Sequence, residues 1–456
     1  MDKPDNLIYM RSLGCNKNTV DSEVILTLLK ERGHIITDDP GEASNIIINT
    51  CAFIDEAKEE AIETICELSR YRKAGASIIV TGCFSQMYHK EIIKKLPEVD
   101  AVIGIGDLKA VIDAVKTPDH KKDFFKSRII GDAYREYPAR DELLTMPGYA
   151  YLKIADGCSR KCAFCLIPLI RGQQRSRDPD RIVEEARNLE KKGVKEIVLV
   201  SQDTLSYGSD LNINRGLKLL IESLLKKTGI RFFRLLYLRP DPELKENLDV
   251  FENDRVLPYF DVPVQHASEK ILKSMNRAGS PLSYSDIIST IRDRFHKAVL
   301  RTSIITGYPG ETEKDFNILL DFIKKIRFDH LGVFSFSPQK ETRAFELKGR
   351  VKTAVIEERK KKLMELQRGI SGKQLKKNIG QSCDVLIEEK ILDRNLYLGR
   401  SFHFAPEVDG VFLVKSKRIL KPGSLIKAKV TRADDYDLHG VEISAFSHSL
   451  NDKKDY

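Results

Sequence analysis

Three cysteines lie within one short stretch of the chain, in the segment DGCSRKCAFCLIPLIRGQQRSR. Cys158, Cys162 and Cys165 are spaced C-x3-C-x2-C, and no further Cys or His follows at the spacing of a zinc finger. A structural zinc ion needs four protein ligands, whereas three thiolates can hold an iron–sulfur cube and leave its fourth iron open. One short loop can wrap three corners of such a cube. The spacing therefore favours a [4Fe-4S] cluster, with zinc as the alternative.

Three more cysteines are far apart in sequence but share one kind of position. Cys15, Cys51 and Cys83 each follow an apolar run directly, in LIYMRSLGC, NIIINTC and SIIVTGC. If these runs are parallel strands of one sheet, the three thiols emerge at the same edge. A second three-thiolate cluster is the preferred interpretation, and three small buried residues are the alternative. Cys66 and Cys383 fit that alternative and receive no chemical role.

The C-x3-C-x2-C loop resembles that of the radical S-adenosylmethionine (SAM) enzymes, which implies that the first cube generates a radical. Two cubes, each with an open iron, then indicate a division of labour. The second cube is expected to hold a sulfur species, a natural ligand of iron, for insertion at an unactivated C–H bond. This resemblance implies that SAM chelates the open iron of the first cube and is cleaved there, while the protein positions the cofactors and excludes water.

Polar residues and glycines at the ends of predicted strands are expected to surround SAM, because ligands of β-α barrels gather at the carboxyl ends of the strands. Gln202 and Gln265 offer amide donors and acceptors, and Gly307 permits close approach of the backbone. Arg277 is suited to pair with the SAM carboxylate. Each residue taken alone fits ordinary surface polarity equally well, but their shared position favours a common ligand.

The elements that must position these groups follow a β-α rhythm in two regions. In residues 5–118, apolar runs alternate with amphipathic stretches at 20–32 and 56–72, which predicts an N-terminal Rossmann-like parallel α/β domain. The charged, irregular stretch 119–146 is predicted to be a linker. Region 144–375 repeats the rhythm with six strands, which indicates a partial (β/α)6 barrel. The predicted strands are 150–155, 196–201, 232–238, 259–264, 299–305 and 331–336.

The last region, residues 376–446, has a different pattern. Short alternating runs broken by Gly, Pro and Asp predict a small, OB-like antiparallel β-barrel, and a charged helical connector at 354–379 leads into it. The whole chain is therefore expected to be an α/β multidomain protein. The helix after the cysteine loop has Asp178 at its N-cap and Gly193 after its last turn.

The composition is that of a soluble globular protein with 456 residues, which is too long for a single core. Lys and Arg number 76 against 67 Asp and Glu, and the net charge of +9 does not distinguish nucleic acid from other partners. No apolar run has the length of a signal peptide or of a membrane span. The sequence predicts a cytoplasmic protein without a membrane partner, in which cysteines stay reduced.

Over essentially its whole length the chain resembles the methylthiotransferases, which combine a cluster-binding N-terminal domain, a radical SAM core and a C-terminal TRAM domain. The segments that carry the resemblance are SLGCNKNTVDSE, NTCAFIDEAKEE, TGCFSQ and the cysteine loop. The segments GYAYLKIADGC and GRSFHFAPEVDG favour the branch that modifies a ribosomal protein. The family most often has Pro where this chain has Asn16, a departure that touches no expected ligand.

The resemblance implies a substrate, namely an aspartate of small-subunit ribosomal protein twelve, methylthiolated at its β-carbon at the expense of two SAM molecules. It also implies an electron donor and a sulfur donor. The TRAM domain is expected to grip the protein substrate, and its mixed charges show no basic stripe for RNA. Two alternatives stay open, a tRNA adenosine methylthiotransferase and a scaffold that holds two clusters without turnover.

Overall fold

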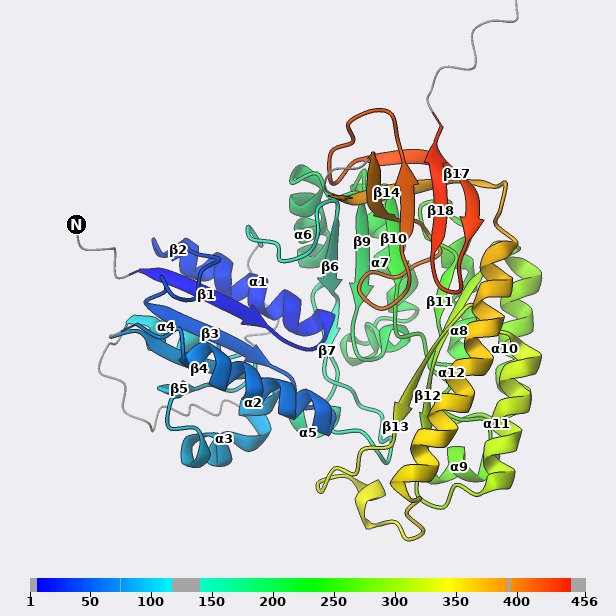
Figure 1. Cartoon of the computed structure of the whole chain (residues 1–456), viewed down its shortest axis with the longest axis horizontal. Helices are drawn as coiled ribbons and strands as arrows, with labels where there is room; N and C mark the ends of the chain where they lie inside the picture. Colours follow the sequence, from blue (N-terminus) through cyan, green and yellow to red (C-terminus); the bar gives the residue numbers. More distant parts are fainter. Residues whose placement is uncertain (1–5, 74, 117–139, 392–394, 444–456) are drawn as a thin grey trace, which may run out of the picture.

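The N-terminal domain is a five-stranded parallel sheet with helices on both faces (Figure 1). The computed structural model describes residues 6–73, 75–116, 140–391 and 395–443. The strand order is β2-β1-β3-β4-β5, and every neighbouring pair is parallel. The strands are β1 (Leu7–Ser12), β2 (Ile35–Ile36), β3 (Asn45–Thr50), β4 (Ser77–Gly82) and β5 (Ala101–Val102). The predicted Rossmann-like domain is confirmed.

Alternating side chains of the central strands fill one core on each face of this sheet. Ile46 and Ile48 of β3 belong to one buried cluster, and Ile47 belongs to the other. All residues of β3 and β4 are buried, the pattern of parallel strands covered on both sides. The covering helices are α1 (Asn16–Lys30), α2 (Asp55–Ser69), α3 (Cys83–Lys95) and α4 (Leu108–Lys116).

The six predicted strands of the central region are all present, and they form two three-stranded parallel sheets. They are β6 (Tyr149–Lys153), β9 (Glu196–Val200), β10 (Phe232–Leu235), β11 (Tyr259–Asp261), β12 (Val299–Thr306) and β13 (His330–Ser335). A parallel bridge between Phe233 and Val256 lies where the two sheets approach, which completes a partial barrel. Strand β10 ends earlier than predicted, because Tyr237 adopts a φ of 61° and leaves the extended conformation.

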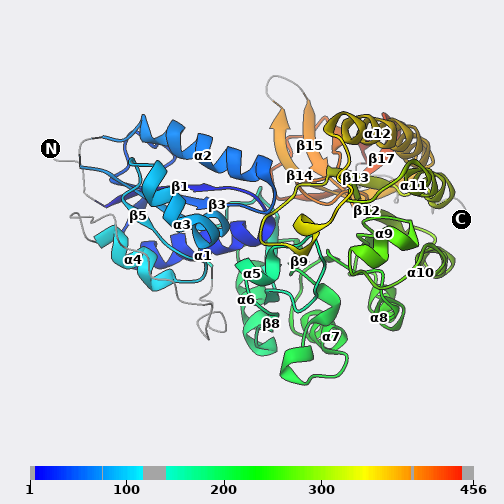
Figure 2. The same cartoon turned by 90° about the horizontal axis from the view of Figure 1, so that it is seen from below.

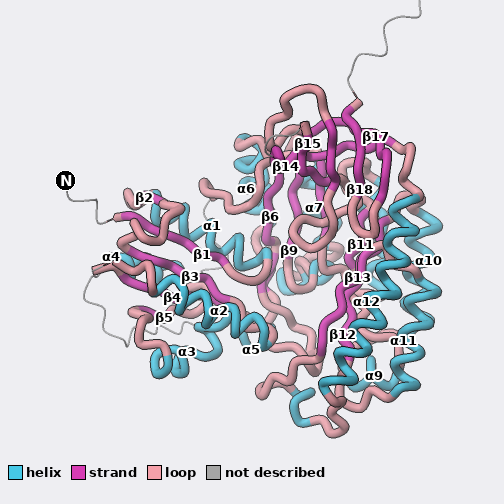
Figure 3. The backbone as a smooth tube through the Cα atoms, in the orientation of Figure 1, coloured by secondary structure: helices cyan, strands magenta, loops and turns pink. Residues whose placement is uncertain are grey.

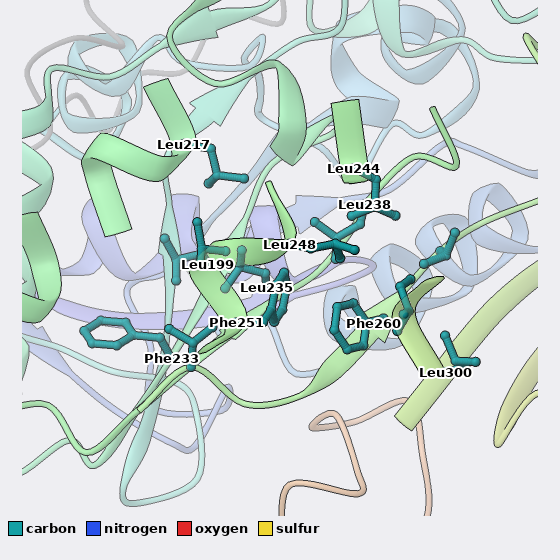
Figure 4. Packing of buried hydrophobic residues seen from close by; sticks show 14 of the residues in the cluster. Leu199, Leu217, Phe233, Leu235, Leu238, Leu244, Leu248, Phe251, Phe260 and Leu300 are labelled. Atoms are coloured by element: carbon teal, nitrogen blue, oxygen red, sulfur yellow. The ribbon is translucent and has the colours of Figure 1, made fainter. Parts of the chain in front are cut away.

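The barrel core is made of leucine and phenylalanine side chains that point from the strands and from the helices outside them, as Figure 4 shows for Leu199, Leu235, Phe233 and Phe260. Asp178 caps the helix after the cysteine loop, as predicted, by accepting hydrogen bonds from the N–H groups of Asp180 and Arg181. The barrel helices are α5 (Ile167–Ile170), α6 (Pro179–Lys191), α7 (Gly216–Lys227), α8 (Pro242–Glu246), α9 (Glu269–Ser274), α10 (Pro281–Arg294) and α11 (Glu313–Ile326). A short antiparallel pair, β7 (Ala155–Asp156) with β8 (Arg175–Ser176), flanks the cysteine loop.

The long helix α12 (Thr353–Lys376) runs along the outside of the barrel and leads into the C-terminal domain (Figures 1 and 3). That domain is a closed barrel of five strands in the order β14-β15-β16-β18-β17. The strands are β14 (Ser382–Ile391), β15 (Leu396–Arg400), β16 (Phe412–Lys415), β17 (Leu425–Ala433) and β18 (Leu438–Glu442). The predicted small barrel is confirmed, with one difference: β16 and β18 pair in parallel, because the chain crosses over between them through β17.

Buried charges join the C-terminal barrel to the central one. Glu196 on β9 accepts hydrogen bonds from Arg234 (2.7 Å) and from Arg400 of β15 (2.7 Å). Nearby, His403 lies between the Ser401 hydroxyl and the Asn378 amide oxygen, at 2.9 and 3.0 Å. Burial lowers the pKa of His403 to about 3, so the ring is neutral at neutral pH.

Of the predicted linker 119–146, residues 119–139 lie outside the described residues. Arg140, in the described part, is buried and pairs with Glu23 of α1 and, at 2.7 Å, with Glu185 of α6. Arg140 therefore links α1 of the N-terminal domain to α6 of the central region. Within the described ranges, no helix has the length and apolar character needed to cross a bilayer.

Candidate functional site

Cys15, Cys51 and Cys83 lie at the carboxyl ends of β1, β3 and β4, which are adjacent in the sheet. Cys15 is the N-cap of α1, Cys51 follows β3 directly, and Cys83 is the first residue of α3. The three strands are parallel, so the structure brings these distant cysteines to one edge, as the sequence predicted.

The electrostatic surroundings of these three thiols differ. Burial raises the pKa of Cys83 to about 12 and also raises that of Cys51. Burial acts in the same direction on Cys15, but the Lys17 ammonium and the Arg171 guanidinium outweigh it, and the pKa of Cys15 is lowered. A metal cluster would hold all three as thiolates, because coordination displaces the proton.

Cys158, Cys162 and Cys165 occupy the loop between β7 and α5, beside the carboxyl ends of the barrel strands. The loop is fixed by backbone hydrogen bonds from Cys158 N–H to Gly172 O (3.0 Å) and from Cys165 N–H to Cys162 O (3.2 Å). Burial raises the pKa of Cys158 and raises that of Cys165 to about 12.

In the part of the chain that the structure describes, no three His, Cys, Asp or Glu side chains converge closely enough to ligate one metal ion. Each thiolate of an iron–sulfur cube binds a different iron, so a cube does not require the sulfurs to meet at one point. The assignment of clusters to the two three-cysteine sets stays a prediction.

Two arginines stand beside Cys162. Arg239 Nη1 lies 3.7 Å from Cys162 Sγ, and Arg277 Nη1 lies 4.0 Å from the same atom. Burial opposes the charge on Arg239, but Asp241, at 2.9 Å from its Nε, raises the pKa. Both arginines line a cavity of about 740 Å³ next to the cysteine loop, together with Arg160, Lys161 and Lys273. The cavity is strongly cationic and suits an anionic ligand group.

The predicted SAM contacts fall into different surroundings. Gln202 donates from Nε2 to Asp156 Oδ1 (2.9 Å), while its buried Oε1 has no partner among the described residues. The buried Nε of Arg277 is likewise without a partner there. Gln265 has a φ of 71° and pairs through its backbone with Ser303 and Ile305, and its side chain is half-buried.

Gly307 has a packing role in this structure. A Cβ at this position would lie 2.4 Å from Ile356 Cγ1 of α12, and the φ of Gly307 is 79°. Its N–H donates to Glu311 Oε2 at 2.7 Å. A Cβ at Gly307 would therefore meet a helix of the protein, and the predicted approach of its backbone to SAM stays a prediction.

The two cysteine sets lie on the two sides of the boundary between the N-terminal domain and the barrel, where α1 packs against β6 and α5 lies next to the N-terminal domain (Figure 2). Buried charges fill this boundary: Arg171 and Lys153 from the barrel side pair with Asp156 and with Asp21 of α1. The charged residues along α1 stand in the segment SLGCNKNTVDSE, but polarity on a helix ordinarily indicates a solvated face. Nothing in the sequence marked these charges as buried.

Family models match three parts of the chain. They are the uncharacterized protein family UPF0004 at residues 7–104, the radical SAM superfamily at residues 152–323 and the TRAM domain at residues 379–443.

Several curated relatives match almost the whole chain. Proteins named ribosomal protein uS12 methylthiotransferase RimO from Thermoanaerobacter sp. and from Aquifex aeolicus are 41% and 42% identical to it. The alignments cover 94% and 95% of this chain and 98% and 96% of the relatives.

Solved structures share the fold at low sequence identity. The radical SAM methyltransferase TsrM from Kitasatospora setae, with cobalamin and a [4Fe-4S] cluster bound, matches with a TM-score of 0.53 and 14% identity. The alignment covers 75% of this chain and 77% of TsrM. The cobalamin-dependent enzyme OxsB matches with a TM-score of 0.51 and 12% identity, over 80% of this chain and 56% of OxsB.

Proposed function

The chain belongs to the RimO family of radical SAM methylthiotransferases, and from this premise we propose that it transfers a methylthio group to ribosomal protein uS12. The acceptor is the β-carbon of one specific aspartate. The observation that carries the proposal is the link between the two three-cysteine sets at one domain boundary. Arg171 contacts Cys83 of one set and pairs with Asp156, two residues before Cys158 of the other set.

Each cysteine set is assigned one [4Fe-4S] cluster with an open iron. The N-terminal set is Cys15, Cys51 and Cys83, and the set in the barrel is Cys158, Cys162 and Cys165. When bound, the clusters and two SAM molecules supply the hydrogen-abstracting radical, the sulfur and its methyl group. The functional units are residues 5–118 for the second cluster, 144–375 for the radical SAM core and 376–446 for substrate binding.

Three side chains are assigned to SAM. The Oε1 of Gln202 and the Nε of Arg277 are both buried, and neither has a hydrogen-bond partner among the described residues. Both are tied to the cysteine loop, Gln202 through Asp156 and Arg277 through its 4.0 Å approach to Cys162. Gln265 stands at the end of the neighbouring sheet. The protein's part is to hold SAM in one orientation and to keep water away.

Two further partners follow from the chemistry. Reductive cleavage of SAM consumes electrons, so an electron donor is required, and each turnover consumes sulfur, so a sulfur donor is required. The enzyme is expected to work in the cytoplasm, on free uS12 or on the ribosomal subunit.

Mass spectrometry of uS12 after co-expression with this chain tests the proposal. We expect the target aspartate to gain about 46 mass units, since SCH3 replaces H. Co-expression with the Cys51→Ala variant is the matched control and leaves uS12 unmodified. Unmodified uS12 together with methylthiolated tRNA adenosine, in cells that carry the intact chain, would replace this function with the tRNA alternative.

A further inference from the structure

We propose that Arg171 is a positioning residue that donates a hydrogen bond to the Cys83 thiolate and thereby raises the reduction potential of the N-terminal cluster. Arg171 follows α5 directly, six residues after Cys165 of the barrel set, whereas Cys83 belongs to the N-terminal domain. The inference rests on the proposed function, because it requires Cys15, Cys51 and Cys83 to hold a cluster.

One end of the guanidinium reaches the N-terminal cysteine set. Arg171 is only 1% exposed, and its Nη2 lies 3.7 Å from Cys83 Sγ. The same nitrogen donates to Asn18 Oδ1. Asn18 in turn donates from Nδ2 to Leu13 O and to Thr50 O, both at 3.0 Å, and Thr50 directly precedes Cys51. A single side chain of the barrel therefore supports the backbone near two of these cysteines and touches the sulfur of the third.

The other end of the guanidinium is fixed by carboxylates. Arg171 Nη1 donates to Asp156 Oδ2 (2.9 Å) and to Asp21 Oδ2 (3.2 Å). Lys153 pairs with the same two carboxylates, so two cations and two anions balance within the buried group. Asp156 also accepts the N–H of Gly157 at 2.8 Å, directly before Cys158. The guanidinium thus links the two cysteine sets and has little freedom to move away from Cys83.

Hydrogen bonds to the sulfurs raise the reduction potential of an iron–sulfur cluster, because they stabilise the additional negative charge of the reduced state. A buried donor acts strongly, since little water is present to screen it. The rigid fork of an arginine can serve a sulfur at one nitrogen and carboxylates at the other, whereas a lysine has only one nitrogen to offer. Arg171→Lys should therefore keep a cation near Asp156 and still lose the contact with Cys83.

The test uses the full chain with Cys158, Cys162 and Cys165 changed to alanine, which leaves one cluster to be measured. Redox titration followed by electron paramagnetic resonance gives its midpoint potential. We expect Arg171→Gln and Arg171→Lys to shift that potential to more negative values. Arg160→Gln is the matched control, because Arg160 pairs with Asp203 and Asp241 and contacts neither Cys15, Cys51 nor Cys83. Its potential should stay unchanged.

A second measurement can be made on the background protein that keeps Arg171, so it does not depend on how well the Arg171 variants fold. In the same background, with all arginines labelled with 15N, the reduced cluster should show a nitrogen hyperfine coupling that Arg171→Lys removes. Absence of this coupling, or an unchanged potential in a variant that retains about four iron atoms, would overturn the inference. Absence of iron from the background protein itself would overturn the second cluster, and hence the proposed function.

Discussion

The Lys17 ammonium lies 3.6 Å from the centre of the Tyr237 ring, across the boundary between the N-terminal domain and the barrel. Lys17 is buried in the first turn of α1, where the helix dipole disfavours a cation. Among the described residues, no carboxylate pairs with it. Burial opposes its charge, but Tyr237 and Cys15 raise the pKa, so the lysine stays protonated. Two residues after Tyr237, Arg239 reaches Cys162, so one short segment contacts Cys162 and the two residues that follow Cys15.

The pair of Lys17 and Tyr237 should contribute to domain docking. A desolvated cation–π contact is worth about 2 kcal/mol. In a double-mutant cycle with Lys17→Met and Tyr237→Leu, followed by urea unfolding of the apo protein, we expect a coupling energy of about 1–2 kcal/mol. Tyr237→Phe is the control, since it keeps the ring and loses the contacts of the hydroxyl group with Asn16 (3.2 and 3.4 Å) and with Lys17. Additive effects of the two changes would contradict this prediction.

Iron content distinguishes two clusters from one. Anaerobic reconstitution of the intact chain should yield about eight iron atoms per chain, and removal of either three-cysteine set should leave about four. Cys66→Ala and Cys383→Ala are matched controls, since these thiols lie in α2 and β14, away from both sets, and they should retain the full content. Four iron atoms in the intact chain would leave only one cluster.

Variants of the two cysteine sets should affect SAM cleavage and product formation differently. Cys162→Ala removes a ligand of the barrel cluster and should abolish release of 5′-deoxyadenosine, measured with SAM and a reductant. Cys51→Ala lies in the other set and should still release 5′-deoxyadenosine while uS12 stays unmodified. Full product formation by Cys51→Ala would show that the N-terminal set is dispensable.

Gly307 should tolerate no side chain. Gly307→Ala combines a φ of 79° with a Cβ only 2.4 Å from Ile356 Cγ1, and we expect a loss of about 1–3 kcal/mol in the free energy of unfolding. Ile356→Ala should restore only part of that loss, because it relieves the contact and leaves the backbone strain. Gly369→Ala in α12 is the matched control. A Cβ there meets nothing within 4 Å, so the helix should be unchanged or slightly more stable.

His403 should make the attachment of the C-terminal barrel sensitive to acid. Its pKa is about 3 in the folded chain and about 6.5 in the unfolded chain, so the unfolded state binds a proton first as the pH falls. The stability it contributes is present above pH 6.5 and declines by about 2 kcal/mol between pH 7 and pH 5. Urea unfolding of the apo protein at the two pH values measures this loss. The His403→Gln variant should lose correspondingly less over the same interval, and an equal loss would contradict the assignment.

The sequence predicted the fold where hydrophobic pattern alone determines it. The runs before Cys51 and Cys83 are continuous and rich in β-branched residues, so they could be recognised as buried parallel strands. With the run before Cys15 in the same sheet, the three thiols had to share an edge. The six barrel strands were predicted for the same reason. The ends of strands were less predictable, because no sequence pattern signals the φ of 61° at Tyr237, a residue type that rarely adopts it.

The polar part of the site could not be predicted in the same way. Asp21, Lys153 and Arg171 are ordinary surface residue types, and only the packing of α1 against the barrel buries them together. A glycine at position 307 indicates that another group lies close to the backbone, but it does not reveal whether that group is a ligand or a helix. Arg140, in a stretch that resembled a linker, is buried for similar reasons of tertiary packing.

The closed C-terminal barrel limits how this domain can hold a protein. Its five strands each pair with two neighbours, so among the described residues no strand has a whole edge free to receive a visiting strand. The C-terminal barrel would therefore have to recognise a segment of uS12 mainly through its own side chains and loops. Recognition of that kind depends on the shape of the visiting loop more than on its ability to become a strand.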